Sequence, residues 1–278
     1  MSDQVDIKDL TVTFLDENHK LTVIKDLSLS VKNGETLAII GESGSGKSVL
    51  GLAILRLLSE SALVSGSIYF QNLDLLTIDE KLMQKIRGRK IAYIPQNPKL
   101  AFNPSMKMWV QLSEPMVIHT GSSWSEAKKT ALKLLKQYGI FPSEKWAEEY
   151  PTAYSGGMLQ RAMMAMGTST LPLVLIADEP TKGIDSLKRK DLADIFKTQK
   201  ELKITQIIIT HDLEFAKEIA DRVAVMYCGQ IVELCTAERF FTDPRHPYSK
   251  GLINALPKRG LCPIPGSAPS MYERHTGC

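Results

Sequence analysis

The sequence predicts an α/β fold with a mostly parallel sheet, preceded by an antiparallel β segment. Residues 5–14 and 23–31 alternate polar and apolar side chains, which is the period of half-buried antiparallel strands. Residues 37–40 and 173–177 are short apolar runs of the kind found in fully buried strands, and a third run follows at 206–210. Because helical patterns separate these buried strands, we expect them to lie parallel.

The segments between the strands carry the helical signal. Apolar residues recur at three- and four-residue spacings over 49–58, and another helix is expected over about 186–201. Residues from about 104 to 168 are rich in Met, Lys and Glu and mostly helical in pattern, which predicts a helical subdomain inserted into a domain that spans 1–241. Residues 242–278 are richer in Pro, Gly and Arg and are expected to form a small C-terminal appendage.

Composition narrows the classes of function. The 278 residues include 34 Lys and Arg against 31 Asp and Glu, and this near balance argues against a dedicated nucleic-acid-binding protein. Four cysteines without CxxC spacing are too sparse for a disulfide scaffold. No apolar run approaches the ~18 residues of a membrane-spanning helix, and the acidic N-terminus lacks the pattern of a secretory signal. We therefore expect a protein of the reducing cytosol.

The most specific motif is a phosphate loop between the strand at 37–40 and the following helix. The segment GESGSGKS fits the pattern GxxxxGK[ST], in which glycines let main-chain N–H groups surround an anion at a helix N-terminus. The lysine would reach the β- and γ-phosphates, and the last serine would bind Mg²⁺. A glycine-rich turn without a ligand would not need the Lys-Ser pair. The motif consists of Gly41, Glu42, Ser43, Gly44, Ser45, Gly46, Lys47 and Ser48.

A pair of acids follows the apolar run at 173–177. The carboxyl ends of strands are where α/β sheets bind ligands. Asp178 suits Mg²⁺, directly or through water, and Glu179 is placed to orient or deprotonate a water that attacks the γ-phosphate. Taken alone, the two acids are equally compatible with a solvated strand end. The guanine-reading NKxD pattern is missing, because Lys and Asp in TKGID stand one residue too far apart, so ATP is favoured over GTP.

A second anion-binding helix start is predicted at YSGGM, residues 154–158. The Ser155 hydroxyl and the N–H groups of Gly156 and Gly157 would form a second phosphate cradle. The alternative is a serine N-cap with flexible glycines. Because the two cradles are far apart in sequence, with a helical insertion between them, the economical arrangement is that the second cradle of one chain completes the site of another chain.

Taken in order, these motifs resemble those of the ATP-binding subunit of an ABC transporter. The resemblance covers nearly the whole chain. It implies a P-loop NTPase with a RecA-like, mostly parallel sheet core, an N-terminal antiparallel β subdomain and an inserted α-helical subdomain. It also implies functions for four residues that their surroundings alone do not assign, namely Phe14, Gln96, Asp185 and His211.

The segment around Gln96, IAYIPQNP, resembles the Q-loop of the oligopeptide, dipeptide and nickel importer ATPases. This implies that Gln96 senses Mg²⁺ or the attacking water, and that Phe102 contacts the coupling helix of a transmembrane subunit. His211 resembles the switch histidine of the family, whose imidazole can donate a hydrogen bond to the γ-phosphate. Outside the family context, a glutamine in a polar loop and a lone histidine at a strand end are more often structural.

Two further residues take their interpretation from the resemblance. Phe14 stands about where the family stacks an aromatic ring on adenine, although a strand aromatic can equally belong to the core. Asp185 matches the aspartate of the loop that crosses the dimer interface. Lys182 and Gly183 replace the Thr or Ser and the Ala usual before it. This departure suits an asymmetric pair in which two different ATPases share one transporter.

The C-terminal segment points to the same branch of the family. Residues 243–248, DPRHPY, and the helix expected to end at 256–257 resemble the C-terminal signature of the peptide and nickel importers. Gly277 and Cys278 resemble the start of a cysteine-rich iron–sulphur segment found in some relatives. Such a cluster needs about four thiolates, so none is expected. The Met-rich stretch 158–166 is expected to be helix core rather than a metal site.

The resemblance implies an ATPase that uses ATP and Mg²⁺ at the cytoplasmic face of the cell membrane, as a peripheral subunit. The expected partners are a second ABC ATPase subunit, identical or different, transmembrane permease subunits and, indirectly, an extracytoplasmic solute-binding protein, with no nucleic acid. Small peptides are the first expectation for the cargo, and nickel or a nickel chelate the second. A soluble ABC ATPase acting in DNA repair or translation and a weakly hydrolytic regulatory partner in a heterodimeric pair remain alternatives.

Overall fold

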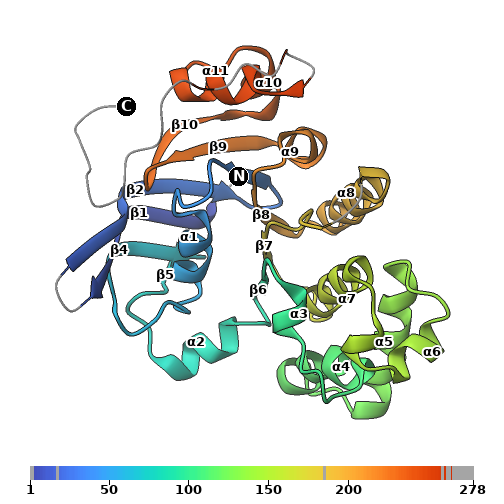
Figure 1. Ribbon diagram of the computed structural model, residues 1–278. Helices are drawn as coiled ribbons and strands as arrows, with labels where there is room; N and C mark the ends of the chain where they lie inside the picture. Colours follow the sequence, from blue (N-terminus) through green and yellow to red (C-terminus); the bar gives the residue numbers. More distant parts are fainter. Residues whose placement is uncertain (1–2, 17–18, 184–185, 258–259, 261–263, 265–278) are drawn as a thin grey trace. The chain divides into compact units, whose positions relative to one another are not determined.

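The computed structural model describes residues 3–16, 19–183, 186–257, 260 and 264 (Figure 1). The chain divides into two units, one formed by Met1–Ile78 with Ile209–Cys278 and the other by Asp79–Ile208. The first unit carries the phosphate-loop motif, and the second carries the helical segment between the sheet strands. The expected boundary between an ATPase domain and an appendage at residues 241 and 242 stays a prediction.

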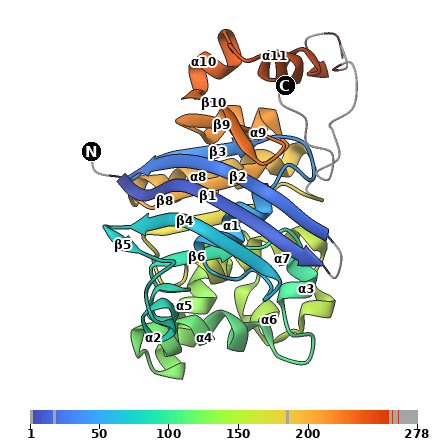
Figure 2. The ribbon, with the colours of Figure 1, turned by 90° about the vertical axis from the view of Figure 1, so that its left-hand side faces the viewer.

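The N-terminal part of the first unit is an antiparallel sheet with the strand order β2-β1-β4-β5 (Figure 2). Strands β1 (Asp3–Asp16) and β2 (His19–Lys32) form a long hairpin. On its other side β1 pairs with β4 (Ala62–Phe70), which is followed by the short β5 (Leu73–Asp74). This confirms the antiparallel β subdomain.

The polar and apolar alternation of β1 is interrupted near its middle. Its buried apolar positions are odd up to Ile7 and even from Leu10 onward, and the register against β2 shifts between these two residues. Asp9, which lies between them, has a φ of 48°, and its N–H donates to the Ser28 hydroxyl at 3.0 Å. A bulge inserts one residue and thereby returns the next apolar side chains to the same face of the sheet. Both halves of β1 therefore bury their apolar residues.

A second group of strands in the first unit carries the phosphate loop. Strand β3 (Thr36–Ile40) pairs in parallel with β9 (Arg222–Tyr227), and β9 pairs antiparallel with β10 (Gln230–Thr236). Every residue of β3 is buried, as its continuous apolar run predicts. Strands β9 and β10, and the helix α9 (Leu213–Ile219) before them, are not among the elements predicted from the sequence.

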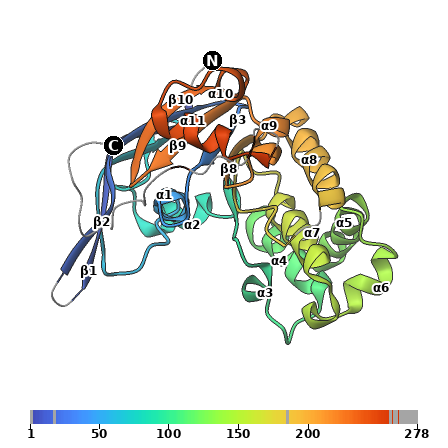
Figure 3. The same cartoon turned by 45° about the horizontal axis from the view of Figure 1, so that its top comes forward.

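The C-terminal helices α10 (Ala237–Thr242) and α11 (Pro247–Asn254) pack on these strands (Figure 3). Their buried side chains share one hydrophobic cluster with β9. The cluster includes Val223, Val225, Phe240, Phe241, Tyr248 and Ile253. The beginning of the predicted C-terminal appendage is therefore part of the hydrophobic core of this unit.

Helix α1 (Lys47–Ile54) is shorter than the periodicity over 49–58 predicts. Arg56, just after its end, has a left-handed φ of 52°, and its guanidinium donates to the main-chain oxygen of Ile78 at 2.7 Å. The Leu57 N–H donates to the Leu52 main-chain oxygen at 2.9 Å, and the Arg56 N–H donates to the Ala53 main-chain oxygen at 3.0 Å. These are the two bonds of a Schellman cap, which turns the chain away from the helix axis. Leu57, which the periodicity places on the apolar face, is consequently 49% exposed. The prediction of the helix end was wrong because this local C-terminal cap stops the helix, although the apolar periodicity continues beyond it.

The second unit contains three strands in the order β8-β7-β6. Strand β6 (Ile91–Ile94) pairs in parallel with β7 (Val174–Asp178), and β8 (Thr205–Thr210) follows helix α8 (Ser186–Glu201) in the chain. Every residue of β7 and β8 is buried. These elements confirm the predicted alternation of buried strands and helices. A short helix α2 (Glu80–Ile86) precedes β6.

The helical subdomain lies between β6 and β7 in the chain (Figure 1). Its helices are α3 (Pro98–Ala101), α4 (Met108–Thr120), α5 (Trp124–Gln137), α6 (Ser143–Glu148) and α7 (Gly156–Thr168), with a 3-10 turn at Pro151–Ala153. This agrees with the helical insertion predicted over about 104–168.

The interior of the helical subdomain is formed largely by α7. Met163 and Met164 are fully buried, as expected for core methionines. At the end of the same helix the Thr168 hydroxyl is hydrogen-bonded to the buried Tyr138 hydroxyl at 2.6 Å. Among the helices that the structure describes, none combines the length and apolar character needed to cross a bilayer.

Candidate nucleotide-binding site

The phosphate loop runs from the end of β3 to the start of α1, which is the local order that the motif requires. Gly44 has a φ of 83°, and Gly46, the N-cap of α1, has a φ of 102°. These left-handed conformations are readily accessible only to glycine. Glu42, Ser43 and Gly44 are exposed, so this part of the loop is open to solvent.

The opposite side of the loop lies directly against main chain from β9 and β2. A Cβ atom added at Gly41 would stand 2.1 Å from the main-chain oxygen of Met226, and one at Gly46 would stand 3.2 Å from the main-chain oxygen of Val23. In addition, the Gly229 N–H donates to the Ser45 main-chain oxygen at 3.0 Å. Close approach of main chain therefore requires glycine at 41, whereas at 46 the left-handed φ is the stronger reason for glycine.

Lys47 is 6% exposed and is enclosed by the loop that carries it. Its ammonium group donates to the main-chain oxygens of Gly41 at 2.8 Å and Glu42 at 2.7 Å, and it lies 3.4 Å from the Ser45 hydroxyl oxygen. An ammonium group has three donors on a flexible stem and can exchange such carbonyl partners for phosphate oxygens, which form stronger charge-assisted bonds. Ser48 is exposed on the first turn of α1.

In the second unit, Asp178 ends strand β7 and is 2% exposed. Its Oδ2 accepts a hydrogen bond from the Tyr93 hydroxyl at 3.0 Å, and Tyr93 stands opposite Ile176 on the neighbouring strand β6. Burial and the adjacent Asp178 carboxylate raise the pKa of Tyr93, so the hydroxyl keeps its proton and remains a donor. Tyr93 was not predicted as a site residue. Its position three residues before Gln96 was the only signal in the sequence.

Glu179, the next residue, is 6% exposed and has a φ of 49°. A left-handed conformation is uncommon for a residue with a long side chain and costs about 1–2 kcal/mol. Such strain persists only where surrounding structure enforces it, and it concentrates at functional sites. The main-chain oxygen of Glu179 accepts from the Lys182 N–H at 3.0 Å, which closes a turn directly after the strand.

Gln96 is exposed and follows strand β6 by two residues. Because β6 and β7 are parallel, with Ile94 opposite Ala177, Gln96 leaves the sheet at the same carboxyl edge as Asp178 and Glu179. The structure therefore brings two separate motifs of the sequence to one edge, where α/β sheets bind ligands.

The second predicted cradle is the start of α7. Ser155 is the N-cap of this 13-residue helix, and its hydroxyl oxygen accepts from the Met158 N–H at 3.3 Å. Ser155 is therefore an N-cap, as the alternative interpretation has it, and the phosphate cradle stays a prediction that the hydroxyl proton, still able to be donated, allows. Ser155 and Gly156 are exposed, and a Cβ added at Gly156 would meet nothing within 4 Å. The helix start is open to a ligand.

Two of the remaining predicted residues, His211 and Phe14, lie within the part of the chain that the structure describes. His211 directly follows β8 and is exposed. Phe14 is half-buried on β1 opposite Leu21, two residues along β2 from the Val23 that borders the loop. Asp185 lies outside the described residues, as do Gly277 and Cys278.

The predicted residues fall into two groups by structural unit. The first unit carries Phe14, Gly41–Ser48 and His211, and the second carries Gln96, Ser155–Gly157, Asp178 and Glu179.

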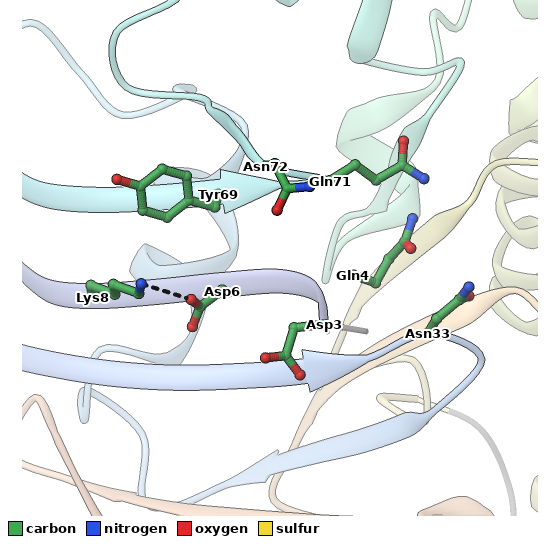
Figure 4. Close-up of a pocket in the computed structure, with 8 residues that line it drawn as sticks. All are labelled: Asp3, Gln4, Asp6, Lys8, Asn33, Tyr69, Gln71 and Asn72. Atoms are coloured by element: carbon green, nitrogen blue, oxygen red, sulfur yellow. Dashed lines mark ion pairs between the residues drawn. The ribbon is translucent and has the colours of Figure 1, made fainter. Parts of the chain in front are cut away.

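The first unit also has a separate polar pocket of about 550 Å³ (Figure 4). The beginning of β1 and the residues around Tyr69 line it, and within it Asp6 forms an ion pair with Lys8. None of the predicted site residues lines this pocket.

Two family models match the sequence. Residues 24–182 match the family described as ABC transporter. Residues 232–278 match the family described as the C-terminal region of oligopeptide/dipeptide transporters. The first match includes the phosphate loop, and the second includes α10 and α11.

Curated relatives cover almost the entire chain. The oligopeptide transport ATP-binding protein OppD of Bacillus subtilis is 41% identical over 282 residues, an alignment that covers 98% of this chain and 79% of the relative. The dipeptide transport ATP-binding protein DppD of Haemophilus influenzae is 40% identical over 281 residues, with 99% and 85% covered. The oligopeptide transport ATP-binding protein AmiE of Streptococcus pneumoniae is 42% identical over 273 residues, with 95% and 77% covered.

Solved structures agree on the fold. The ATP-binding cassette MJ0796, in a dimeric post-hydrolysis state bound to ADP and Pi, is 27% identical with a TM-score of 0.76, covering 84% of this chain and 98% of that one. The cbiO1 protein of Clostridium perfringens, part of the ABC transporter complex cbiONQ, is 27% identical with a TM-score of 0.73, covering 87% and 92%. Together with the phosphate loop and the family matches, these similarities show that the chain belongs to the ABC transporter family as an ATP-binding subunit.

Proposed function

We propose that this chain hydrolyses ATP to power the import of small peptides, as a peripheral subunit on the cytoplasmic face of the membrane. The observation that carries the proposal is the phosphate loop. Its main chain, at Gly41 and Glu42, holds the Lys47 ammonium at the start of α1, where a helix N-terminus and N–H groups favour an anion. Peptides are favoured as cargo because the similar OppD, DppD and AmiE are named as peptide transport proteins.

The residues of the site fit ATP with Mg²⁺. Lys47 and the loop N–H groups bind the phosphates, and the Phe14 ring stacks on adenine. The Ser48 hydroxyl, the Asp178 carboxylate and the Gln96 amide supply oxygen donors, which are the ligands that Mg²⁺ prefers. The cation neutralises phosphate charge during the reaction. Asp178 is preorganised for this by the Tyr93 hydrogen bond, which orients its carboxylate.

Hydrolysis is assigned to two further side chains. Glu179 orients the attacking water or accepts its proton, and His211 donates a hydrogen bond to the γ-phosphate. The left-handed main chain of Glu179 supports this assignment, because such backbone strain concentrates at functional sites.

The complete site requires two chains. Ser155, Gly156 and Gly157 of one chain bind the γ-phosphate held by the loop of the other, and Asp185 contributes at the same interface. The open start of α7 supports this arrangement, as does the dimeric state of the similar cassette bound to ADP and Pi. Charge-assisted bonds from both chains are made only in the closed dimer, so ATP closes it and hydrolysis reopens it.

A hollow in the second unit is suited to a transmembrane partner. It measures about 290 Å³, and its apolar lining includes Phe102, Tyr154 and Leu159. Phe102 lies six residues after Gln96, and Tyr154 precedes the Ser155 cradle, so a helix of a permease subunit seated here would contact both motifs. Closure of the dimer would then move that helix.

The proposal is tested by copurifying the chain with its permease subunits, reconstituting the complex in vesicles and measuring ATP hydrolysis with different solutes. Peptides of a few residues, presented with the matching solute-binding protein, should stimulate turnover. If only nickel or a nickel chelate stimulates ATP hydrolysis, the assigned cargo changes from peptides to nickel, the second expectation. Absence of any association with permease subunits would contradict the transport assignment.

A further inference from the structure

The phosphate loop is hydrogen-bonded to the C-terminal segment at a residue that none of the nucleotide-binding motifs includes. The Glu42 N–H donates to the Tyr248 hydroxyl oxygen at 3.1 Å, across 206 residues of sequence. The main-chain oxygen of the same Glu42 accepts from the Lys47 ammonium at 2.7 Å. A single loop residue is therefore held by Tyr248 on its N–H and by the lysine on its carbonyl.

Tyr248 is itself firmly placed. It is 5% exposed, and its ring packs on the Tyr227 ring with the centroids 4.6 Å apart. Tyr227 ends strand β9, beside the Met226 main chain that Gly41 approaches. Burial raises the pKa of Tyr248 to about 12, so the side chain is a neutral hydroxyl at any physiological pH. It can accept the Glu42 N–H without titrating.

A side chain of strand β10 fixes where Tyr248 lies in the folded protein. The Glu233 carboxylate accepts from the N–H groups of Arg245 and His246, each at 2.9 Å. The His246 side chain then caps α11, because its Nδ1 accepts from the Tyr248 N–H at 3.2 Å. These contacts fix the turn before α11 and present the tyrosine ring toward the loop.

We propose that Tyr248 is a positioning residue for nucleotide binding. Its hydroxyl holds the Glu42 main chain, and thereby the two carbonyls on which Lys47 rests, in the arrangement that receives a triphosphate. This inference rests on the proposed function of the phosphate loop. A loop that is already ordered loses less conformational entropy when the ligand binds, so its affinity is higher. By thermodynamic linkage, a nucleotide bound to the loop must in turn stabilise the docked α11.

The test is Tyr248→Phe in the full chain, which removes one hydroxyl and keeps the ring on Tyr227. Affinity for a fluorescent ATP analogue should fall about two- to tenfold, the usual net effect of one hydrogen bond. Amide hydrogen exchange at Glu42 should become faster in the nucleotide-free protein. In the unsubstituted chain, saturation with the analogue should slow amide exchange at the start of α11.

Tyr138→Phe is the matched control. Its hydroxyl is also buried and hydrogen-bonded, to Thr168 at 2.6 Å and from the Gln199 amide at 3.1 Å, but it belongs to the helical unit. Tyr138→Phe should lower the thermal unfolding temperature about as much as Tyr248→Phe does, and it should leave the affinity for the ATP analogue unchanged. If the two tyrosine variants weaken binding equally, the effect is one of general stability and the positioning function is refuted.

Unchanged affinity and unchanged exchange at Glu42 in Tyr248→Phe would also overturn the inference. Lys47→Ala separates this failure from a failure of the proposed function. If Lys47→Ala loses the analogue while Tyr248→Phe keeps it, the phosphate loop stands and only the positioning function falls. If Lys47→Ala binds the analogue as tightly as the unsubstituted chain, the loop is not the nucleotide site and both fall together.

Discussion

Lys47 combines a positive charge with near-complete burial. Its hydrogen bonds to the carbonyls of Gly41 and Glu42 replace the water that the ammonium group gives up. Because these partners are neutral, a phosphate oxygen competes with them successfully. In the proposed function, the Lys47 charge therefore lies where the triphosphate binds, and it contributes its full interaction energy only when the ligand is bound.

Lys47→Ala should weaken binding of a fluorescent ATP analogue by about 10- to 100-fold, the loss of a hydrogen bond to a charged group. Titration of both proteins with the analogue measures this. Lys197→Ala, at an exposed position on α8, is the control and should bind normally. Equal affinities for Lys47→Ala and the unsubstituted chain would show that another part of the protein holds the phosphates.

Glu179→Gln should keep ATP bound and slow hydrolysis by ~10²-fold or more, the range lost with a general base. The amide is nearly isosteric with the carboxylate, so it leaves the strained turn intact while removing the proton acceptor. Phosphate release under saturating ATP gives the rate, and the analogue titration confirms binding. Turnover at the original rate would remove Glu179 from the mechanism.

At the scale of elements, the loop is defined by its contacts with β9 as much as by its own sequence. Gly41 and Gly34 both have positive φ values, of 156° and 73°, but only at Gly41 does another main chain approach. A Cβ at Gly34 would meet nothing within 4 Å. Gly34 therefore carries only the cost of its left-handed backbone, whereas Gly41 carries a backbone cost and the cost of close approach together.

Gly41→Ala should abolish detectable binding of the ATP analogue, because its methyl group would overlap the Met226 main-chain oxygen and force the loop to move. Gly34→Ala should bind normally and lose only about 1–2 kcal/mol of unfolding free energy from its left-handed backbone. Analogue titration and urea unfolding of both variants provide the comparison. Normal binding by Gly41→Ala would mean that the loop tolerates displacement from β9.

The turn between α10 and α11 depends on an ionised Glu233. Burial alone would raise the pKa of Glu233, but the hydrogen bonds to its carboxylate, among them those from the N–H groups of Arg245 and His246, act together with the Arg239 charge and hold the pKa below its ordinary 4.5. Since the folded pKa lies below the unfolded one, the carboxylate contributes its full stabilisation above about pH 4.5 and loses it as the pH falls through the folded pKa.

Glu233→Gln should accordingly lower the unfolding free energy by about 1–3 kcal/mol near neutral pH, since one N–H loses a charged acceptor. The difference from the unsubstituted protein should shrink as the pH falls through the lowered folded pKa of Glu233 and the carboxylate is protonated. Urea unfolding followed at several pH values measures this difference. A difference that remained constant at low pH would show that the carboxylate charge does not hold the turn.

At the scale of the whole molecule, the nucleotide site is proposed to be complete only in a pair of chains. Each chain carries one loop and one helix start, so a dimer has two composite sites. The Lys182-Gly183 pair, which departs from the family pattern, suits a pair of different subunits. In that case one of the two sites differs from the other in the segment before Asp185.

Gly156→Asp tests the composite site. The exposed helix start has room for the side chain, and a carboxylate there is compatible with the helix dipole, so the variant should fold. Its negative charge should repel a partner-bound triphosphate. In a Glu179→Gln variant, ATP should convert the chain to a dimer that elutes earlier in size-exclusion chromatography. Adding Gly156→Asp should prevent dimer formation. The affinity of the monomeric chain for the ATP analogue should stay unchanged. ATP-dependent association that survives Gly156→Asp would place the second cradle elsewhere.

The sequence was sufficient wherever the signal is local. The buried runs at β3 and β7, the GESGSGKS loop and the helix start at Ser155 follow from patterns a few residues long, because period and turn chemistry act between near neighbours. It failed where a distant contact decides the outcome. The bulge at Asp9, for example, depends on the partner strand. The end of α1 was also missed, because Arg56 takes the left-handed conformation of a Schellman cap although arginine does not favour it.

The functional features can also be separated into those that the sequence determined and those that only the structure showed. The sequence by itself determined that the chain carries a phosphate loop, an acidic strand end and the motif order of an ABC ATPase. Only the tertiary structure decided that Tyr93 orients Asp178, that Glu179 adopts a left-handed turn and that Tyr248 holds Glu42. The two hydrogen bonds join residues far apart in the chain, and the left-handed turn depends on the packing around it. The free energy of such interactions depends on the folded surroundings, which no short sequence pattern contains.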